Sequence, residues 1–119
     1  MGAIYGKRGY MFHAPPGADF SSHIEPIFRD LRKDVKDKNR VQIYVIGGEE
    51  VNDQYKDETR AGRQTVLDKI VRSGFEYCIK VVRWCPFNHN QTLSLILSEG
   101  RAEIEEDSEE DMINEINGW

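Results

Sequence analysis

The sequence predicts one α/β domain, a two-layer sandwich in which a mixed sheet carries two helices on one face. Two segments place apolar residues three and four positions apart, as helices with one buried face do. The remaining segments alternate apolar and polar residues or are rich in β-branched and aromatic residues, as strands are. These elements follow one another as β-α-β-α-β-β-β, an order typical of helices packed against a sheet.

Length and composition favour a soluble globular protein. The chain has 119 residues, which suits one domain, with 39% apolar and 31% charged residues. It contains no apolar stretch of the length that a bilayer requires and no secretory signal. We therefore expect a cytoplasmic protein that does not bind membranes, and the scattered basic residues give no support for nucleic-acid binding.

The first helix is predicted over residues 23 to 36 and the second over residues 58 to 73. Ser22 and Glu25 form a capping box before the first, and Gly74 is placed to end the second. The apolar residues that define the two helical stripes are Ile24, Ile27, Phe28, Leu31 and Val35 in the first, and Val66, Leu67, Ile70 and Val71 in the second.

Strands occupy the rest of the predicted sandwich. The segment "RGYMFHAPPG", residues 8 to 17, indicates a strand that ends near His13, because two prolines and a glycine follow at once. A strand over residues 41 to 46 stops at Gly47 and Gly48. After Gly74 the pattern predicts strands in "FEYCIKVVRW", "QTLSLILS" and "RAEIEE", with the last two joined as a hairpin.

Two cysteines, Cys78 and Cys85, are expected to be free thiols. The residues between them read as a strand, which would hold their α-carbons about 20 Å apart, whereas a disulfide needs about 6 Å.

The charge of the chain is divided along its length. The net charge is −5, but residues 103 to 119 contain eight acids and no base, which leaves 13 acids and 16 bases, a charge of +3, in the rest. We assign residues 1 to 104 to the sandwich and residues 105 to 119 to an acidic tail. The tail is either a solvated segment, a cover for a basic face of the domain or a contact with a partner, and Met112, Ile113, Ile116 and Trp119 suggest a short anchoring helix.

Three residue types could carry chemistry. His13 at a strand end is either a general base or a histidine bonded to backbone, and no Cys, Ser, Thr, Asp or Glu precedes it. Cys85 and His89 are the nearest approach to a nucleophile and base pair. Gly47 and Gly48 leave backbone amides that either hold an anion or form a tight turn. The ligand spacing of a zinc site and the motifs of nucleotide binding are lacking, so no metal and no cofactor are predicted.

The order of these segments resembles the CheD family, the chemoreceptor glutamine deamidases of bacterial chemotaxis. Gly9-Tyr10-Met11-Phe12-His13 resembles the family's Gly-x-Met-x-His stretch, in which the histidine is the catalytic base. "IYVIGGEE" is similar to the family's strand ending in Gly-Gly-Ala, and Gly62-Arg63-Gln64 resembles its Gly-x-Arg-Asn at a helix start but is one residue shorter. The resemblance covers residues 9 to 105 and implies the sandwich fold, His13 as a base, and binding roles for Gly47, Gly48 and Arg63.

The chain departs from the family at the nucleophile. Family members carry a cysteine in a Gly-Ser-Cys stretch before the histidine, and this chain has no cysteine in the twelve residues before His13. We therefore expect a CheD-like binding or regulatory module without deamidase activity, with another protein as its partner. The alternatives are a thiol-dependent amidohydrolase that uses Cys85 with His89 or His13, and a purely structural subunit; the sequence carries no signal for the oligomeric state.

Overall fold

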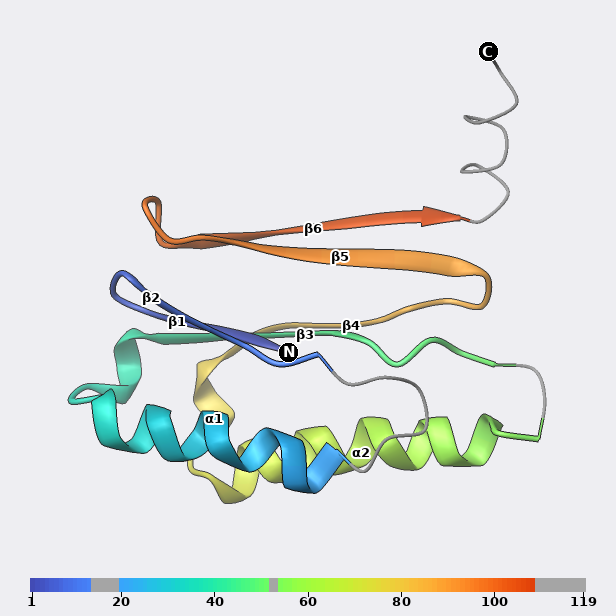
Figure 1. The fold of residues 1–119 in the computed structure, drawn as a ribbon, viewed down its shortest axis with the longest axis horizontal. Coiled ribbons are helices and arrows are strands. Elements are labelled where there is room, and N and C mark those ends of the chain that lie inside the picture. Colours follow the sequence, from blue (N-terminus) through green and yellow to red (C-terminus); the bar gives the residue numbers. More distant parts are fainter. Residues whose placement is uncertain (14–19, 52–53, 109–119) are drawn as a thin grey trace, which may run out of the picture.

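A computed structural model describes residues 1–13, 20–51 and 54–108 of the chain. It contains a four-stranded mixed sheet, a separate two-stranded sheet and two long helices (Figure 1). The prediction of a mixed α/β fold with both helices on one face of a sheet is confirmed. The elements are β1 (Gly2–Tyr5), β2 (Arg8–Met11), α1 (Phe20–Asp34), η1 (Lys38–Arg40), β3 (Val41–Gly47), α2 (Lys56–Arg72), η2 (Glu76–Cys78), β4 (Ile79–Trp84), β5 (His89–Ile96) and β6 (Arg101–Ser108).

The four-stranded sheet has the order β2-β1-β3-β4. Strand β1 is antiparallel to both β2 and β3, and β3 is parallel to β4. Three strands, β2, β3 and β4, therefore run in one direction and end at the same edge of the sheet. Open α/β sheets carry their binding sites at this edge, and it is where the chain places the segments that contain His13, Gly47 and Cys85.

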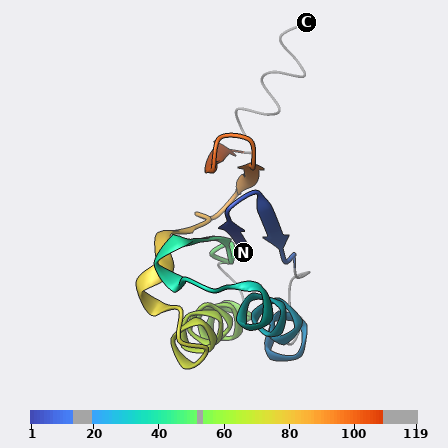
Figure 2. The ribbon, with the colours of Figure 1, turned by 90° about the vertical axis from the view of Figure 1, so that its left-hand side faces the viewer.

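The main core lies between this sheet and the helices. Alternate residues of β3, namely Val41, Ile43 and Val45, point toward the helices and are almost fully buried. The figures show α1 and α2 side by side below the sheet (Figures 1 and 2). The helices and the turn after α2 fill this core with Ile24, Phe28, Leu31, Val66, Ile70 and Phe75.

The hairpin of β5 and β6 forms a third layer on the opposite face of the sheet (Figure 2). A β-carbon added at Gly2 would lie 2.9 Å from Leu93 Cδ2, and one added at Gly9 would lie 3.0 Å from Leu97 Cδ2. The absence of side chains at these two glycines therefore lets the hairpin leucines approach the sheet backbone. The side chain of Gln42 adds a bond across the layers by donating to the carbonyl oxygen of Gly100 at 3.0 Å.

The observed boundaries differ from the predicted ones at several elements. Helix α1 begins at Phe20 and ends at Asp34, earlier at both ends than the predicted 23 to 36, and α2 covers Lys56–Arg72 instead of 58 to 73. The first strand is divided in two because Gly6, with a φ of 61°, reverses the chain. Strand β6 continues to Ser108, four residues into the segment assigned to the tail. The helix predicted near Met112 lies outside the described residues.

No helix in the described part of the chain has both the length and the apolar character needed to cross a membrane.

Candidate functional site

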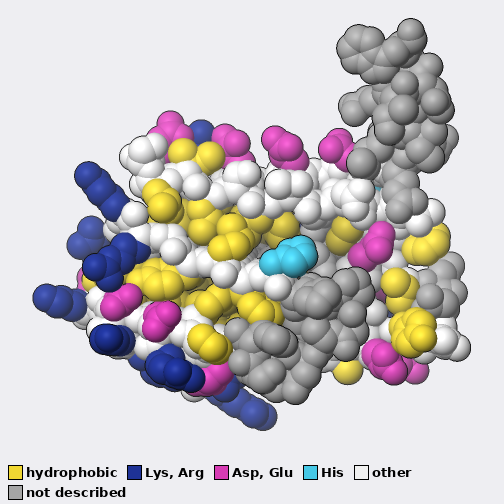
Figure 3. Space-filling view, viewed as in Figure 1, with side chains coloured by type: hydrophobic (Ala, Val, Ile, Leu, Met, Phe, Trp, Pro, Cys, Tyr) yellow, Lys and Arg dark blue, Asp and Glu magenta, His cyan; other side chains and the backbone are white. Residues whose placement is uncertain are grey.

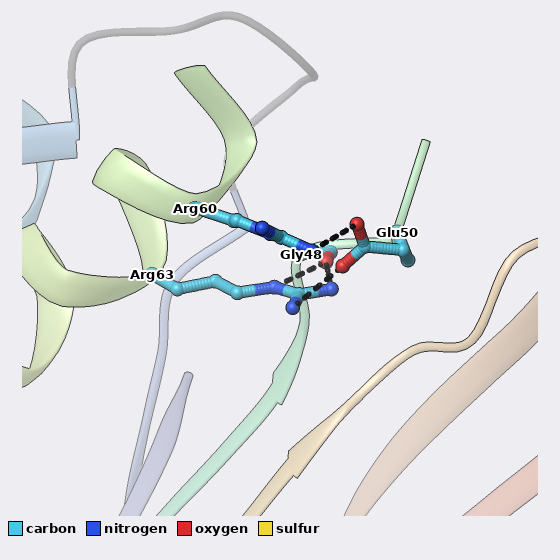
Figure 4. A network of polar contacts seen from close by, with 4 residues as sticks. All are labelled: Gly48, Glu50, Arg60 and Arg63. Atoms are coloured by element: carbon cyan, nitrogen blue, oxygen red, sulfur yellow. Dashed lines mark hydrogen bonds and ion pairs between the residues drawn. The ribbon is translucent and has the colours of Figure 1, made fainter. Parts of the chain in front are cut away.

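The turn after β3 is the best-defined polar site at the sheet edge (Figure 4). Gly47 and Gly48 both have positive φ angles, 90° and 56°, a backbone conformation that favours glycine. A β-carbon at Gly48 would lie 3.1 Å from Arg63 Cγ and 3.3 Å from Trp84 Cε3. The second glycine therefore meets two requirements: it permits the turn, and it leaves room for a helix side chain to lie against the turn.

Arg63 of α2 holds this turn. Its Nε donates to the carbonyl oxygen of Gly48 at 2.8 Å, its Nη2 donates to the same oxygen, and its Nη1 lies 3.0 Å from Glu50 Oε2. The guanidinium also lies over the Trp84 ring, 5.4 Å from the centroid, and the side chain is only 16% exposed. The three predicted binding residues are thus close together, but the fold itself already uses the donors of Arg63.

The backbone amide of Gly47, one of the two that could hold an anion, is also engaged. The Gly47 N–H donates to Gln91 Oε1 at 2.7 Å, and Gln91 Nε2 donates in turn to Glu106 Oε1 at 2.7 Å. Arg60 adds a second cation at Glu50, with 3.5 Å between Nη2 and Oε1 (Figure 4). We conclude that this arrangement is a clamp that joins α2, the β3 turn and the hairpin.

Cys85 follows β4 at the same edge and is 4% exposed. Its backbone N–H donates to the Gly47 carbonyl at 2.7 Å, and its carbonyl accepts from the Glu50 N–H at 2.9 Å. Its Sγ lies 3.0 Å from the carbonyl oxygen of His89, to which the thiol donates. Burial raises the pKa of the Cys85 thiol, and the carboxylates of Glu49 and Glu106 raise it further, so the thiol form is favoured.

The ring of His89 is not the partner of that thiol. The contact from Cys85 reaches the backbone of His89, whereas the ring Nδ1 lies 2.8 Å from the carbonyl oxygen of Phe87. Because a carbonyl can only accept, this contact requires the proton on Nδ1. The two residues predicted as a nucleophile and base pair are therefore adjacent, but they do not form the thiolate–imidazole contact that activates a cysteine.

His13 lies at the same edge of the sheet as Cys85, but it follows β2, the outer strand on the opposite side of the sheet from β4. Strand pairing continues from β2 to Phe12, whose N–H donates to the Met1 carbonyl at 2.8 Å, and His13 is the next residue. Three strand spacings separate β2 from β4, which places His13 about 14 Å from Cys85. His13 is exposed and makes no hydrogen bond with any described residue. The fold thus keeps this histidine away from the Cys85 thiol.

No pattern in the sequence pointed directly to the partners of the clamp. Glu50 and Trp84 belong to segments far from Arg63 in the chain, and only the spacing of Arg60 and Arg63 on one helix face could have indicated a shared carboxylate. Both cysteines are free, as predicted. Within residues 1–13, 20–51 and 54–108, no group of three or more His, Cys, Asp and Glu side chains is arranged to hold a metal ion.

Comparison of the chain with protein-family models, with curated proteins and with solved structures finds no match.

Proposed function

We propose that this chain is a CheD-like binding or regulatory module that acts through contacts with another protein and has no deamidase activity. The observation that carries the proposal is the state of Cys85: its thiol is buried, donates to a backbone carbonyl and has a raised pKa. The resemblance to the chemoreceptor deamidases rests on the sequence motifs, and the α/β sandwich is the fold that this resemblance implies.

Deamidation of a glutamine by a thiol enzyme needs a thiolate that attacks the carboxamide carbon. Ammonia then leaves with a proton from a general acid, and water hydrolyses the thioester to give a glutamate side chain and the free thiol. A thiol that is donating to the His89 carbonyl has its sulfur directed at backbone, and the substrate amide would have to displace that contact. Among the described residues, the nearest thiol at this edge lies about 14 Å from His13, too far for His13 to deprotonate it.

An ammonia-release assay tests this proposal. The full chain is incubated with a glutamine-containing fragment of a bacterial chemoreceptor, and ammonia is measured for the wild type and for Cys85→Ala, His89→Ala and His13→Ala. We expect no release above the buffer rate from any of the four proteins. If the wild type releases ammonia and Cys85→Ala does not, the chain is a thiol amidohydrolase and not a binding module.

A titration of the same fragment, followed by calorimetry, measures binding in parallel. We expect saturable binding with unchanged fragment mass, because a binding module leaves its partner chemically intact. Absence of both binding and ammonia release would remove the chemoreceptor fragment as the partner and leave the resemblance without functional support.

A further inference from the structure

One end of the molecule carries a concentrated positive charge. We call it the basic end, and it consists of Lys7, Arg8, Lys33, Lys36, Lys38 and Arg40, all of them exposed. Figure 3 shows Lys and Arg side chains gathered at one end of the molecule on the face in view, and Figure 1 places the end of α1 and the β1–β2 turn there. The sequence analysis allowed for a basic face of the domain but could not locate it, because the basic residues are interspersed with acids along the chain.

The fold brings these residues together from four elements. The backbone N–H of Lys36, just after α1, donates to the hydroxyl of Tyr5 at the end of β1, at 3.1 Å. Arg8 at the start of β2 pairs with Asp34 in the last turn of α1, with 3.3 Å between Nη1 and Oδ2. Tyr5 is also opposite Val41 in the sheet, so Arg40 of η1 lies beside the same turn.

The charge of the basic end is not neutralised within the described part of the chain. Arg8 is the only one of its six cations that forms an ion pair with a described residue. The acids among them are Asp34 and Asp37, so six cations against two carboxylates leave a net charge of +4. Both carboxylates are further occupied, since Asp34 accepts from the hydroxyl of Tyr10 and Asp37 accepts from the backbone N–H of Asn39.

A structural role explains only part of this cluster. Cations near the carboxyl end of a helix interact favourably with its dipole, which accounts for Lys33 in the last turn of α1 and Lys36 just after it. Lys7 and Arg40 belong to a hairpin turn and a 3₁₀ helix, where no such interaction stabilises them. Their convergence on the same surface indicates attraction to an anionic partner.

The same chain carries a matching anionic segment. Residues 105 to 111 contain six acids among seven residues and no base; we call them the acidic segment. Its first part lies on β6, where Glu105, Glu106 and Asp107 are all exposed. Glu99 and Glu103, at the other end of the hairpin, are already paired with Arg101.

Within one molecule the two charged regions lie too far apart to neutralise each other. The bond from Gln42 to the Gly100 carbonyl places the start of β6 beside the basic end, and β6 runs away from it (Figure 1). Ser108 is therefore about 27 Å from Gly100 along the strand. Glu105, Glu106 and Asp107, the described acids of the segment, lie about 17 Å or more from Gly100 along the strand, twice the screening length of about 8 Å at physiological salt.

We propose that the acidic segment of one copy of this protein binds the basic end of a second copy. The contact joins unlike surfaces, so it is heterologous, and each added copy presents a free basic end and a free acidic segment. The net charge of −5 does not prevent the contact at physiological salt, because repulsion between parts of the two molecules more than about 8 Å apart is screened. This inference does not depend on the function proposed above.

Sedimentation of the full chain over a range of concentrations tests the contact. At about 100 mM salt the mass-average mass of the wild type should rise with protein concentration, and at about 500 mM salt it should return to the monomer value, because the attraction is screened. The basic variant Lys7→Gln, Lys36→Gln, Arg40→Gln and the acidic variant Glu109→Gln, Glu110→Gln, Asp111→Asn should each weaken association at least about fivefold. The control Lys56→Gln, Arg60→Gln, Arg83→Gln removes three cations at the opposite end of the sheet and should not weaken it.

A mixing experiment separates this contact from other modes of association. The basic variant keeps its acidic segment and the acidic variant keeps its basic end, so an equimolar mixture should form pairs of one copy of each and nothing larger. The proposal is wrong if the wild type stays monomeric at about 100 mM salt, if the control weakens association as much as the basic variant does, or if the mixture forms no pairs. A monomeric wild type whose binding to an oligonucleotide is lost in the basic variant would assign the basic end to nucleic acid instead.

Discussion

The Nε of Arg63 donates to the carbonyl oxygen of Gly48 at 2.8 Å, and the same guanidinium lies 5.4 Å from the centroid of the Trp84 ring. One side chain from α2 therefore fixes the turn after β3 and covers the end of β4. Glu50, which forms an ion pair with Arg63, also bonds through its backbone to Cys85. The clamp thus sets the position of the buried thiol on which the proposed function depends.

Gly48→Ala should destabilise the protein more than an alanine substitution at a glycine of similar φ that has no atoms near the added β-carbon. At a φ of 56° an alanine costs about 1 kcal/mol, and its β-carbon would also press on Arg63 and Trp84 at 3.1 Å and 3.3 Å. Gly6→Ala is the matched control, because Gly6 has a φ of 61° and nothing within 4 Å of the added carbon. Urea unfolding should show a loss about 1 kcal/mol larger for Gly48→Ala; equal losses would mean that the clamp tolerates the added carbon.

Arg63→Lys should lower the free energy of unfolding by about 1–2 kcal/mol although it keeps the positive charge. An ammonium cannot donate from two nitrogens to the Gly48 carbonyl while it contacts Glu50 and stacks on Trp84. Arg60→Lys is the comparison, since Arg60 makes a longer contact of 3.5 Å with Glu50 and its side chain is 58% exposed. It should change stability by less than about 0.5 kcal/mol in the same urea titration. A similar loss in both variants would argue against the clamp.

Leu95→Ala tests whether the hairpin packs on the sheet as a third layer. The Leu95 side chain approaches Gly2 and Gly9 on the face of the sheet that the helices leave uncovered. Its loss should reduce the free energy of unfolding by about 1–2 kcal/mol, less than for a fully buried leucine, because the side chain is half-buried. Thr92→Ala, on the exposed side of the same strand, should lie within about 0.5 kcal/mol of the wild type. Similar stability of the two variants in chemical denaturation would mean that the hairpin is not docked.

Glu25 should make the stability of the protein depend on acidity. Hydrogen bonds from Lys69 and Arg32 hold the pKa of this carboxyl down at about 2, against 4.5 in an unfolded chain. Because the folded pKa is the lower one, the stabilisation is fully present above pH 4.5 and is lost as the pH falls toward 2. Glu25→Gln should therefore flatten the acid side of a plot of melting temperature against pH. Asp30→Asn, an exposed acid on the same helix, should leave that plot unchanged; the same flattening in both variants would exclude Glu25 as its source.

The elements that could be predicted from the sequence are those with a regular pattern. The alternation in Val41, Ile43 and Val45 and the stripes of the two helices indicate burial on one face. The structure buries these three strand residues and, in the helices, Ile24, Phe28, Leu31, Val66 and Ile70, whereas Val71, which was predicted in the second stripe, is 47% exposed. The separation of the final hairpin into its own sheet was not predictable, because β5 and β6 would alternate in the same way if they extended the main sheet. What decides their position is contact with Gly2 and Gly9, far away in the sequence.

The candidate site, like the fold, could be predicted from the sequence only in part. The sequence indicated Gly48 and Arg63 through a resemblance, and the structure brings them into contact. It also indicated Cys85 and His89 as neighbours, which they are, but the identity of the contacting atoms depends on the φ of 56° at Asn88 and on the exit from β4. Spacing alone does not distinguish a thiol that faces an imidazole from one that faces a carbonyl.

Titration of the Cys85 thiol tests the central claim most directly. In a Cys78→Ala background, the ultraviolet absorbance of the thiolate is followed against pH in the folded protein and again in denaturant. Burial and the nearby carboxylates raise the pKa, so the folded protein should form the thiolate at a higher pH than the denatured chain does. A folded-state thiolate that forms below pH 7.5 would show an activated cysteine, and the chain would then be a candidate enzyme instead of a binding module.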